Sequence, residues 1–280
     1  MRTIRELFIE SSVKSIHSKK ATYEEMKSIT TTSLSEAKEL DKREKVNDGE
    51  RTIARIAGIL FIVATLASLV STAFLTSINS SNYLTEISAN KNSVMTGVLF
   101  AVIGAAACAG IAISLYPVLR KYSSGLALGA VGFRLVEGAL YLVGAIGLIS
   151  LVTLSQEFVK SGSLQSSSYF QTLGLLMLNQ YHWVSFGAAP FFFGIGAFMY
   201  YVIFHQTRLV PRWLSDWGIV GASLCVLTSV IVMVGLLGPF STIQVVLVLP
   251  IGVQEMVLAT WLIVKGFQNT GARAISMKGL

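Results

Sequence analysis

Residues 53–78 read IARIAGILFIVATLASLVSTAFLTSI and decide the fold, because a single charged residue, Arg55, interrupts this apolar run. As an α-helix the run rises roughly 39 Å, which exceeds the roughly 30 Å hydrocarbon core of a bilayer. A run this long is typical of a transmembrane helix. It is too long for the apolar region of a cleavable signal peptide, so we expect it to remain as a signal anchor.

Five more apolar runs of similar length follow the first one. In a bilayer the backbone polar groups must be satisfied within the protein, which favours helices over isolated strands. We therefore predict an all-α, polytopic transmembrane bundle of six helices. The predicted spans lie near residues 53–78, 93–119, 126–154, 173–204, 215–237 and 243–265.

The charged residues are unevenly distributed. The chain is 13% charged and 53% apolar, whereas a soluble domain carries about 25% charged residues. Residues 1–52 hold 11 of the 22 basic and 10 of the 15 acidic side chains. This composition argues against a soluble enzyme. It predicts a polar, partly disordered cytoplasmic arm over 1–52, a six-helix membrane domain over 53–268 and a cytoplasmic tail over 269–280.

Basic residues indicate the orientation of the bundle. Eight flank one side of the predicted spans, namely Arg55, Arg120, Lys121, Arg208, Arg212, Lys265, Arg273 and Lys278, and the other side has only Lys91 and Lys160. Because cytoplasmic loops carry the excess of Lys and Arg, both termini should be cytoplasmic. The net charge of +7 thus reflects orientation in the bilayer, and we expect no nucleic-acid partner.

Three ionisable residues fall well inside the predicted spans: Arg134, Glu137 and Glu255. Each costs roughly 2.5–3.5 kcal/mol at mid-bilayer, so none should face lipid. Counted at 1.5 Å per residue, all three lie roughly 12–16 Å from the cytoplasmic ends of their helices. We expect Arg134 to bridge the two carboxylates, with Gln254 beside Pro250 in a distorted sixth helix.

Two interpretations of this cluster remain open. It is either a proton or small-cation site, or the polar floor of a ligand pocket, because intramembrane charges are functional by default. Alternatively it is a structural ion pair that sets the register of the helices.

The fourth span carries a second group of polar residues near its outer end, Asn179 and His182. Tyr181 and Trp183 flank the histidine, and such aromatic residues are enriched at membrane interfaces. We expect an interfacial structural histidine. The alternative is that a bend at Pro190 lets Asn179 and His182 cap an outer-side pocket.

The segment LVPRWLSDW, residues 209–217, connects the fourth and fifth spans. Pro211 and Ser215 fit a turn followed by an N-cap. Arg208, Arg212 and Trp213 are predicted to anchor the chain at the headgroups; recognition of anionic lipid is the weaker alternative.

No recognised catalytic motif occurs in the sequence, so we do not expect an enzyme, and we expect no cofactor. Cys108 and Cys225 lie in separate apolar runs without a CxxC pattern, and His182 lacks companion ligands. We therefore expect neither a metal site nor a disulfide.

Four stretches resemble a known family: ARIAGILFIV from Ala54, GLALGAVGFRLVEGAL from Gly125, LVPRWLSDWG from Leu209, and the region of Glu255, Trp261, Lys265 and Gly266. The chain is similar over roughly residues 53–268 to the prokaryotic membrane proteins known as domain of unknown function 4386. The resemblance implies a six-helix protein of a prokaryotic cell membrane, with no assigned activity and no catalytic residues to transfer. The arm 1–52 is longer than the family's usual lead.

The leading functional interpretation is a membrane protein that binds or conducts a small solute, proton or lipid at the level of Arg134. The alternative is a regulatory protein whose arm contacts a protein partner. In the arm, Ser33 and Glu36 predict a short helix near 34–46, which Asp48 and Gly49 would end. Deleting residues 1–49 would abolish a docking function and spare transport.

Overall fold

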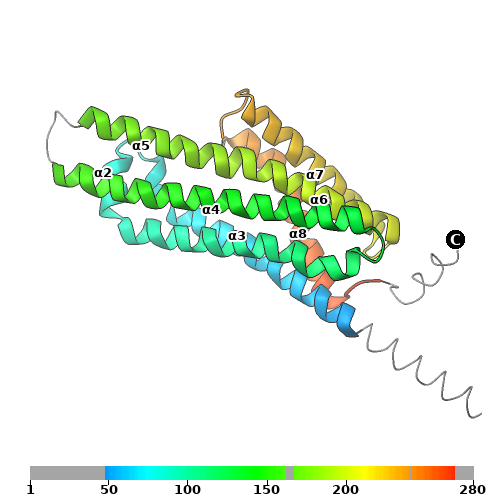
Figure 1. Cartoon of the computed structure of the whole chain (residues 1–280). Coiled ribbons are helices and arrows are strands. Elements are labelled where there is room, and N and C mark those ends of the chain that lie inside the picture. The colour runs from blue at the N-terminus through cyan, green and yellow to red at the C-terminus, as the bar shows by residue number, and fades with distance from the viewer. Residues whose placement is uncertain (1–47, 162–166, 240, 269–280) are drawn as a thin grey trace, which may run out of the picture. The chain divides into compact units, whose positions relative to one another are not determined.

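The computed structural model describes residues 48–161, 167–239 and 241–268, and the regular elements in these ranges are all helical. The described residues between Glu50 and Gln268 belong to one compact unit (Figure 1). Six helices in the described ranges are long and apolar enough to cross a membrane. The predicted all-α class with six spans is confirmed, and the chain is a multi-pass membrane protein.

The helices follow one another in an up-and-down order. The first membrane helix is Asp48–Phe74. The later elements are η1 (Thr76–Asn79), α2 (Tyr83–Ala89), α3 (Lys91–Leu119), α4 (Ser124–Ser161), α5 (Ser167–His182), η2 (Trp183–Ala188), α6 (Ala189–Thr207), α7 (Arg212–Met233) and α8 (Thr242–Val264). Of these, α5, η2 and α6 join in one long span, Ser168–Thr207.

Two expectations about helix ends differ from the structure. Asp48 and Gly49 lie inside the first helix and do not end one. Glu50 stabilises this helix start, because its carboxylate pairs with Lys121 at 2.7 Å. Ser215 was the predicted N-cap, but α7 begins at Arg212 after Pro211, and Ser215 is buried in the first turn, where its hydroxyl donates to the Arg212 carbonyl. The predicted helix near 34–46 lies outside the described residues.

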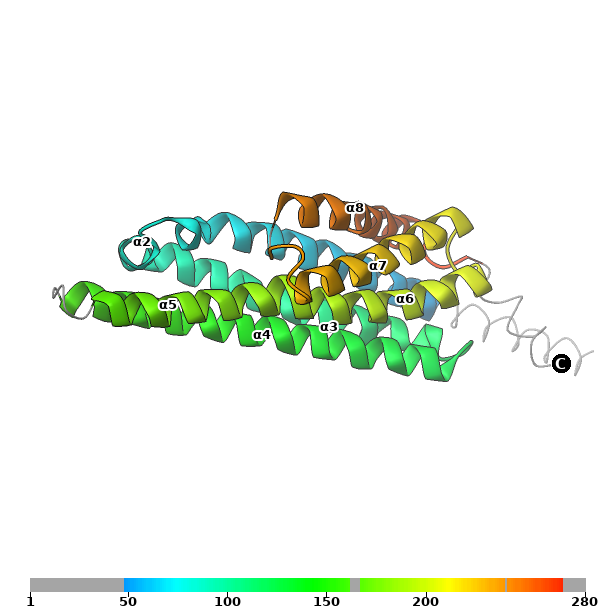
Figure 2. The ribbon, with the colours of Figure 1, turned by 90° about the horizontal axis from the view of Figure 1, so that it is seen from above.

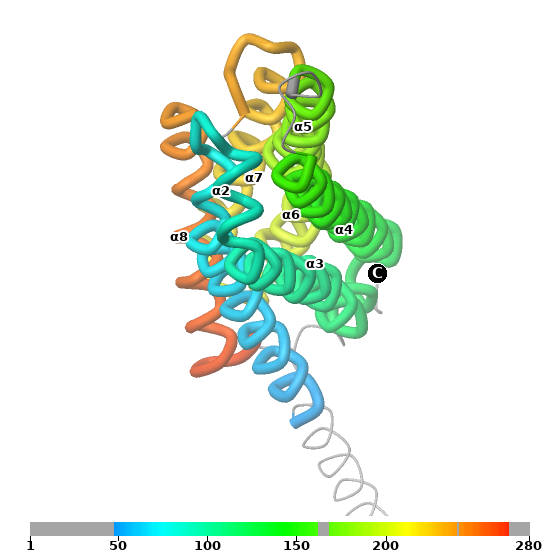
Figure 3. Tube along the Cα trace, turned by 90° about the vertical axis from the view of Figure 1, so that its left-hand side faces the viewer, coloured from blue at the N-terminus to red at the C-terminus, as the bar shows by residue number. Residues whose placement is uncertain are grey.

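Close helix packing depends on small residues, as is typical when lipid supplies no hydrophobic drive between helices. A Cβ added at Gly58 of the first helix would lie 2.7 Å from the Ala259 carbonyl oxygen of α8. A Cβ at Gly194 of α6 would lie 3.0 Å from the Ala222 carbonyl oxygen of α7. The first and last membrane helices therefore pack side by side (Figure 3).

One end of the bundle gathers most of the basic residues. Lys121 after α3 pairs with Glu50, and the Gln268 backbone N–H after α8 donates to the Leu209 carbonyl between α6 and α7 at 2.8 Å. These contacts bring the helix ends together. We name this region the cationic end; its residues are Arg51, Arg55, Arg120, Lys121, Arg208, Arg212 and Lys265. That it faces the cytoplasm stays a prediction.

At the far end, opposite the cationic end, the helices stop at different heights. The 38 residues of α4 rise roughly 57 Å, whereas the 22 residues of α7 rise roughly 33 Å. Gly187 in η2 lies level with Met233 at the end of α7. Helix α5 therefore continues beyond α7 and α8, alongside α4 (Figures 1 and 2).

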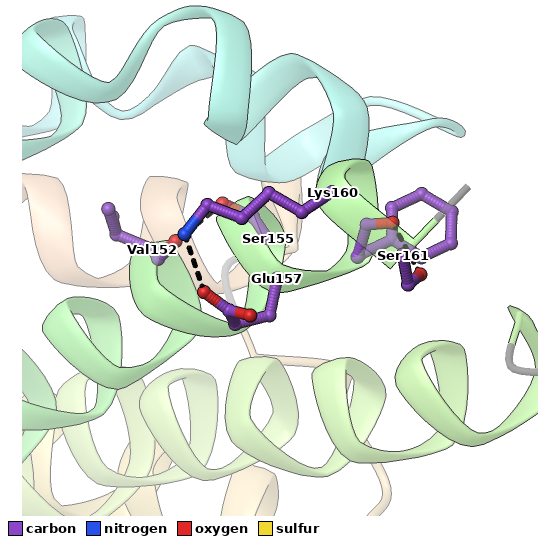
Figure 4. Close-up of polar contacts among 6 residues, drawn as sticks. Val152, Ser155, Glu157, Lys160 and Ser161 are labelled. Carbon is purple, nitrogen blue, oxygen red and sulfur yellow. Dashed lines mark hydrogen bonds and ion pairs between the residues drawn. The ribbon is translucent and has the colours of Figure 1, made fainter. Parts of the chain in front are cut away.

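The projecting end of α4 carries several polar contacts between residues three apart in the helix. Lys160 pairs with Glu157 at 2.8 Å on the exposed surface of the helix (Figure 4). The hydroxyl of Ser155 donates to the Val152 carbonyl, and that of Ser161 donates to the Phe158 carbonyl. Glu157 is exposed, which makes it a useful reference for the buried glutamates.

A π-helical turn, η2, separates α5 from α6. Pro190 has no N–H, so it cannot donate the helical hydrogen bond to the Phe186 carbonyl. The side chain of Gln244, at the start of α8, donates to that carbonyl at 2.5 Å. The π turn just before Pro190 is thus tied to α8.

Candidate functional site

The buried cluster forms around Arg134, near the middle of α4. Its side chain is 1% exposed, and Nη1 lies 3.0 Å from Oε2 of Glu137, which is 2% exposed. The two residues are three apart, so they share one face of the helix. Arg134 Nε also donates to the Cys108 carbonyl of α3, at 3.3 Å. The predicted contact between Arg134 and Glu137 is present.

Helix α6 encloses the other side of the guanidinium. Its Cζ lies 4.9 Å from the centre of the Phe193 ring, a cation–π geometry that suits a desolvated arginine. Gly196 supplies the space, because an added Cβ there would lie 3.1 Å from Arg134 Cγ. Helices α3, α4 and α6 therefore hold Arg134 inside the bundle and away from lipid.

Glu255 reaches the cluster from α8, on a different side. It interacts electrostatically with Arg134 and Glu137. Its carboxylate oxygens, however, lie more than 4.0 Å from the nitrogens of Arg134, so the two side chains do not form an ion pair. The polar side chain beside its buried carboxylate is the Tyr200 hydroxyl. Of the two contacts expected for Arg134, the ion pair with Glu137 is present and the one with Glu255 is not. The reason is packing: α8 lies against α7 and the first helix, whereas Arg134 turns to its own helix and to α3.

Gln254 points to a different partner. It is fully buried, its Oε1 accepts from the Tyr201 hydroxyl at 2.5 Å, and its Nε2 donates to the Leu214 carbonyl at 2.9 Å. Both ends of the amide are therefore occupied. Gln254 connects α8 to α6 and α7, which is a positioning role beside Glu255.

Two tyrosines of α6 belong to this region and escaped the sequence analysis. Tyr200 and Tyr201 are both fully buried, with ring centres 4.5 Å apart. The buried Tyr200 hydroxyl lies beside Glu255 and interacts electrostatically with it. The signal was the pair of hydroxyls in the apolar run AFMYYVIF, because buried tyrosines usually find a polar partner.

Asn179 and His182 lie far from the cluster. Gly196, which packs on Arg134, is 14 residues from His182, or roughly 21 Å along the helix. Asn179 is exposed, and His182 packs its ring near those of Tyr181 and Phe186. The structure therefore does not join these two residues to the buried charges.

The predicted interface anchors lie at the turn between α6 and α7. Arg208 ends α6 in a left-handed conformation with a φ of 56°, and Arg212 begins α7; both are exposed. Trp213 is 54% exposed. This placement at the cationic end is compatible with headgroup contact, which stays a prediction.

In the described ranges, no group of three or more His, Cys, Asp or Glu side chains is arranged to hold a metal ion. The chemistry available at the cluster is proton binding by carboxylates and hydroxyls, beside one fixed cation.

The comparisons with known proteins concern the membrane bundle. A family model described as a domain of unknown function (DUF4386) matches residues 56–266, from the first helix to the end of the last. No curated protein and no solved structure gives a significant match. Because the match extends over most of the sequence, this chain belongs to the DUF4386 family.

Proposed function

We propose that this membrane protein binds or conducts a small solute at the Arg134 cluster, and that the solute is a proton held on Glu255. The observation that carries the proposal is the buried carboxylate of Glu255, which lies beside the Tyr200 hydroxyl and forms no ion pair with any described residue. Arg134 has its ion pair with Glu137 already. The second carboxylate therefore has no cation of its own.

The charges of the cluster support a proton. One guanidinium and two carboxylates sum to minus one when all are ionised, and an uncompensated charge inside a protein in lipid costs several kcal/mol. One proton on Glu255 makes the cluster neutral. The nearby Tyr200 hydroxyl can then exchange a hydrogen bond with the acid as it binds or releases the proton.

Infrared difference spectroscopy on protein in nanodiscs tests this proposal. The wild type should show the carbonyl stretch of a protonated carboxylic acid at neutral pH, and Glu255→Gln should lose it. Glu157→Gln makes the same chemical change at the exposed end of α4, so it should keep the band. A wild type without the band, or a band that persists in Glu255→Gln, would overturn the proposal.

A further inference from the structure

A second titratable pair lies at the cationic end, above the cluster. The Nδ1 atom of His205, near the end of α6, makes a short hydrogen bond with Oδ1 of Asp216 in the first turns of α7. The two side chains are 42% and 52% exposed. Both groups therefore lie at the surface of the bundle, close to the helix ends that form the cationic end. An imidazole can both donate and accept a proton through its two ring nitrogens.

The position of His205 on α6 connects the surface to the buried tyrosines. His205 follows Tyr201 by four residues, so it lies on the same face of α6, roughly 6 Å further along the axis. Tyr201 is fully buried and donates to Gln254, the residue before Glu255. One helical turn thus separates an exposed imidazole from a hydroxyl inside the bundle.

From Tyr201 the polar groups continue to Glu255. The Tyr200 ring centre lies 4.5 Å from that of Tyr201. Its hydroxyl is buried and is close enough to Glu255 to interact electrostatically. Apart from this series, the neighbouring side chains of the α6 and α8 interior are mostly apolar, for example Ile203, Ile251 and Leu258.

The geometry points to His205 and Asp216 as the place where protons enter the bundle on their way to Glu255, an inference that rests on the proposed function. An N–H bond of protonated His205 breaks, and Asp216 stabilises the charged imidazole before transfer. Water bridges the turn to the Tyr201 hydroxyl, and the Tyr201 and Tyr200 hydroxyls each accept one proton and release another. An O–H bond forms at Glu255, and no oxidation or reduction takes place.

The charged side chains near His205 belong to the turn between α6 and α7 and to the first turns of α7. Arg208 and Arg212 flank it on the two helices, and both are exposed. Asp216 is the charged group that contacts His205. It places a negative charge beside the imidazole, at a turn that also carries two cations.

The test is the rate at which Glu255 gains its proton after a rapid pH drop, followed through its infrared band in nanodiscs. His205→Phe should slow the rate by roughly a hundredfold, the low end of what a positioned proton donor contributes, and should leave the final band unchanged. Asp216→Asn, which keeps the side-chain size, and Tyr201→Phe should slow it as well. Lys121→Gln alters another ion pair of the same end and should not change the rate.

Each outcome separates this inference from the proposed function. A normal final band with unchanged rates in His205→Phe and Asp216→Asn would overturn the inference and leave the proton on Glu255 intact. Protons would then enter from the far end. A wild type without the band would overturn the proposed function itself.

Discussion

Arg134 is the residue whose loss we expect to harm the fold most. Without it, Glu137 and Glu255 face each other as two buried carboxylates, and removing one partner of a buried ion pair typically costs about 3–5 kcal/mol. Arg134→Gln should therefore destabilise the bundle by about that amount. Glu255→Gln leaves the Arg134–Glu137 pair in place and should cost less. Thermal unfolding of both variants in the same detergent measures the difference; equal losses would contradict this assignment of the ion pair.

Gly218 gives a second prediction at the residue scale. A Cβ at this position would lie 2.4 Å from the Tyr201 ring, which Gln254 holds in place. Gly218→Ala should therefore cost about 1–3 kcal/mol through overpacking.

Gly132 is the matched control for this change. It is also helical, but nothing lies within 4 Å of its added Cβ. Gly132→Ala should be neutral or should stabilise the helix by up to about 1 kcal/mol. The two melting temperatures in detergent are compared. A Gly218→Ala variant as stable as Gly132→Ala would show that Tyr201 moves freely.

At the scale of the elements, the π turn η2 depends on α8. The side chain of Gln244 donates to the carbonyl of Phe186 in this turn, beside Pro190, which has no N–H to donate. Gln244→Leu removes this hydrogen bond between α8 and the π turn and should destabilise the protein by about 0.5–1.5 kcal/mol, the net contribution of one hydrogen bond.

A double-mutant cycle tests the cause of that loss. Pro190→Ala restores a backbone N–H, so the same Gln244→Leu change should cost less in the Pro190→Ala background. Unfolding in mixed micelles gives the four free energies. Equal costs in the two backgrounds would mean that Gln244 acts independently of the proline.

Some elements of the fold could be predicted from the sequence, and others could not. The six spans follow from apolar length alone, and the Arg134–Glu137 pair follows from a spacing of three within one helix. Helix α2 was missed because its polar sequence gives no membrane signal. The partners of Gln254 depend on how α8 crosses α6 and α7, which no spacing within one helix reveals. The position of a residue along its own helix was therefore predictable from the sequence. Its contacts with residues of other helices were not.

At the scale of the whole molecule, the structure predicts which sites share a side of the membrane. Native Cys108 and Cys225 are buried, so the wild type should react little with a membrane-impermeant maleimide. Cysteines introduced at Arg212 and Lys160, at the cationic and far ends, should react from opposite sides of sealed vesicles. The excess of basic residues predicts that Arg212 lies on the cytoplasmic side. Labelling of both positions from one side would contradict a six-span bundle.

The pairing of the first helix with the last has a consequence for biosynthesis. Gly58 packs against Ala259, so the groove on the first helix stays open to lipid until translation reaches the final helix. Arg134 and Glu137 leave the ribosome on one helix and neutralise each other at once. Glu255 is made last and meets a cation that already has a partner. Its segment is therefore inserted at lowest cost when the carboxyl group already carries its proton, before the bundle has closed around it.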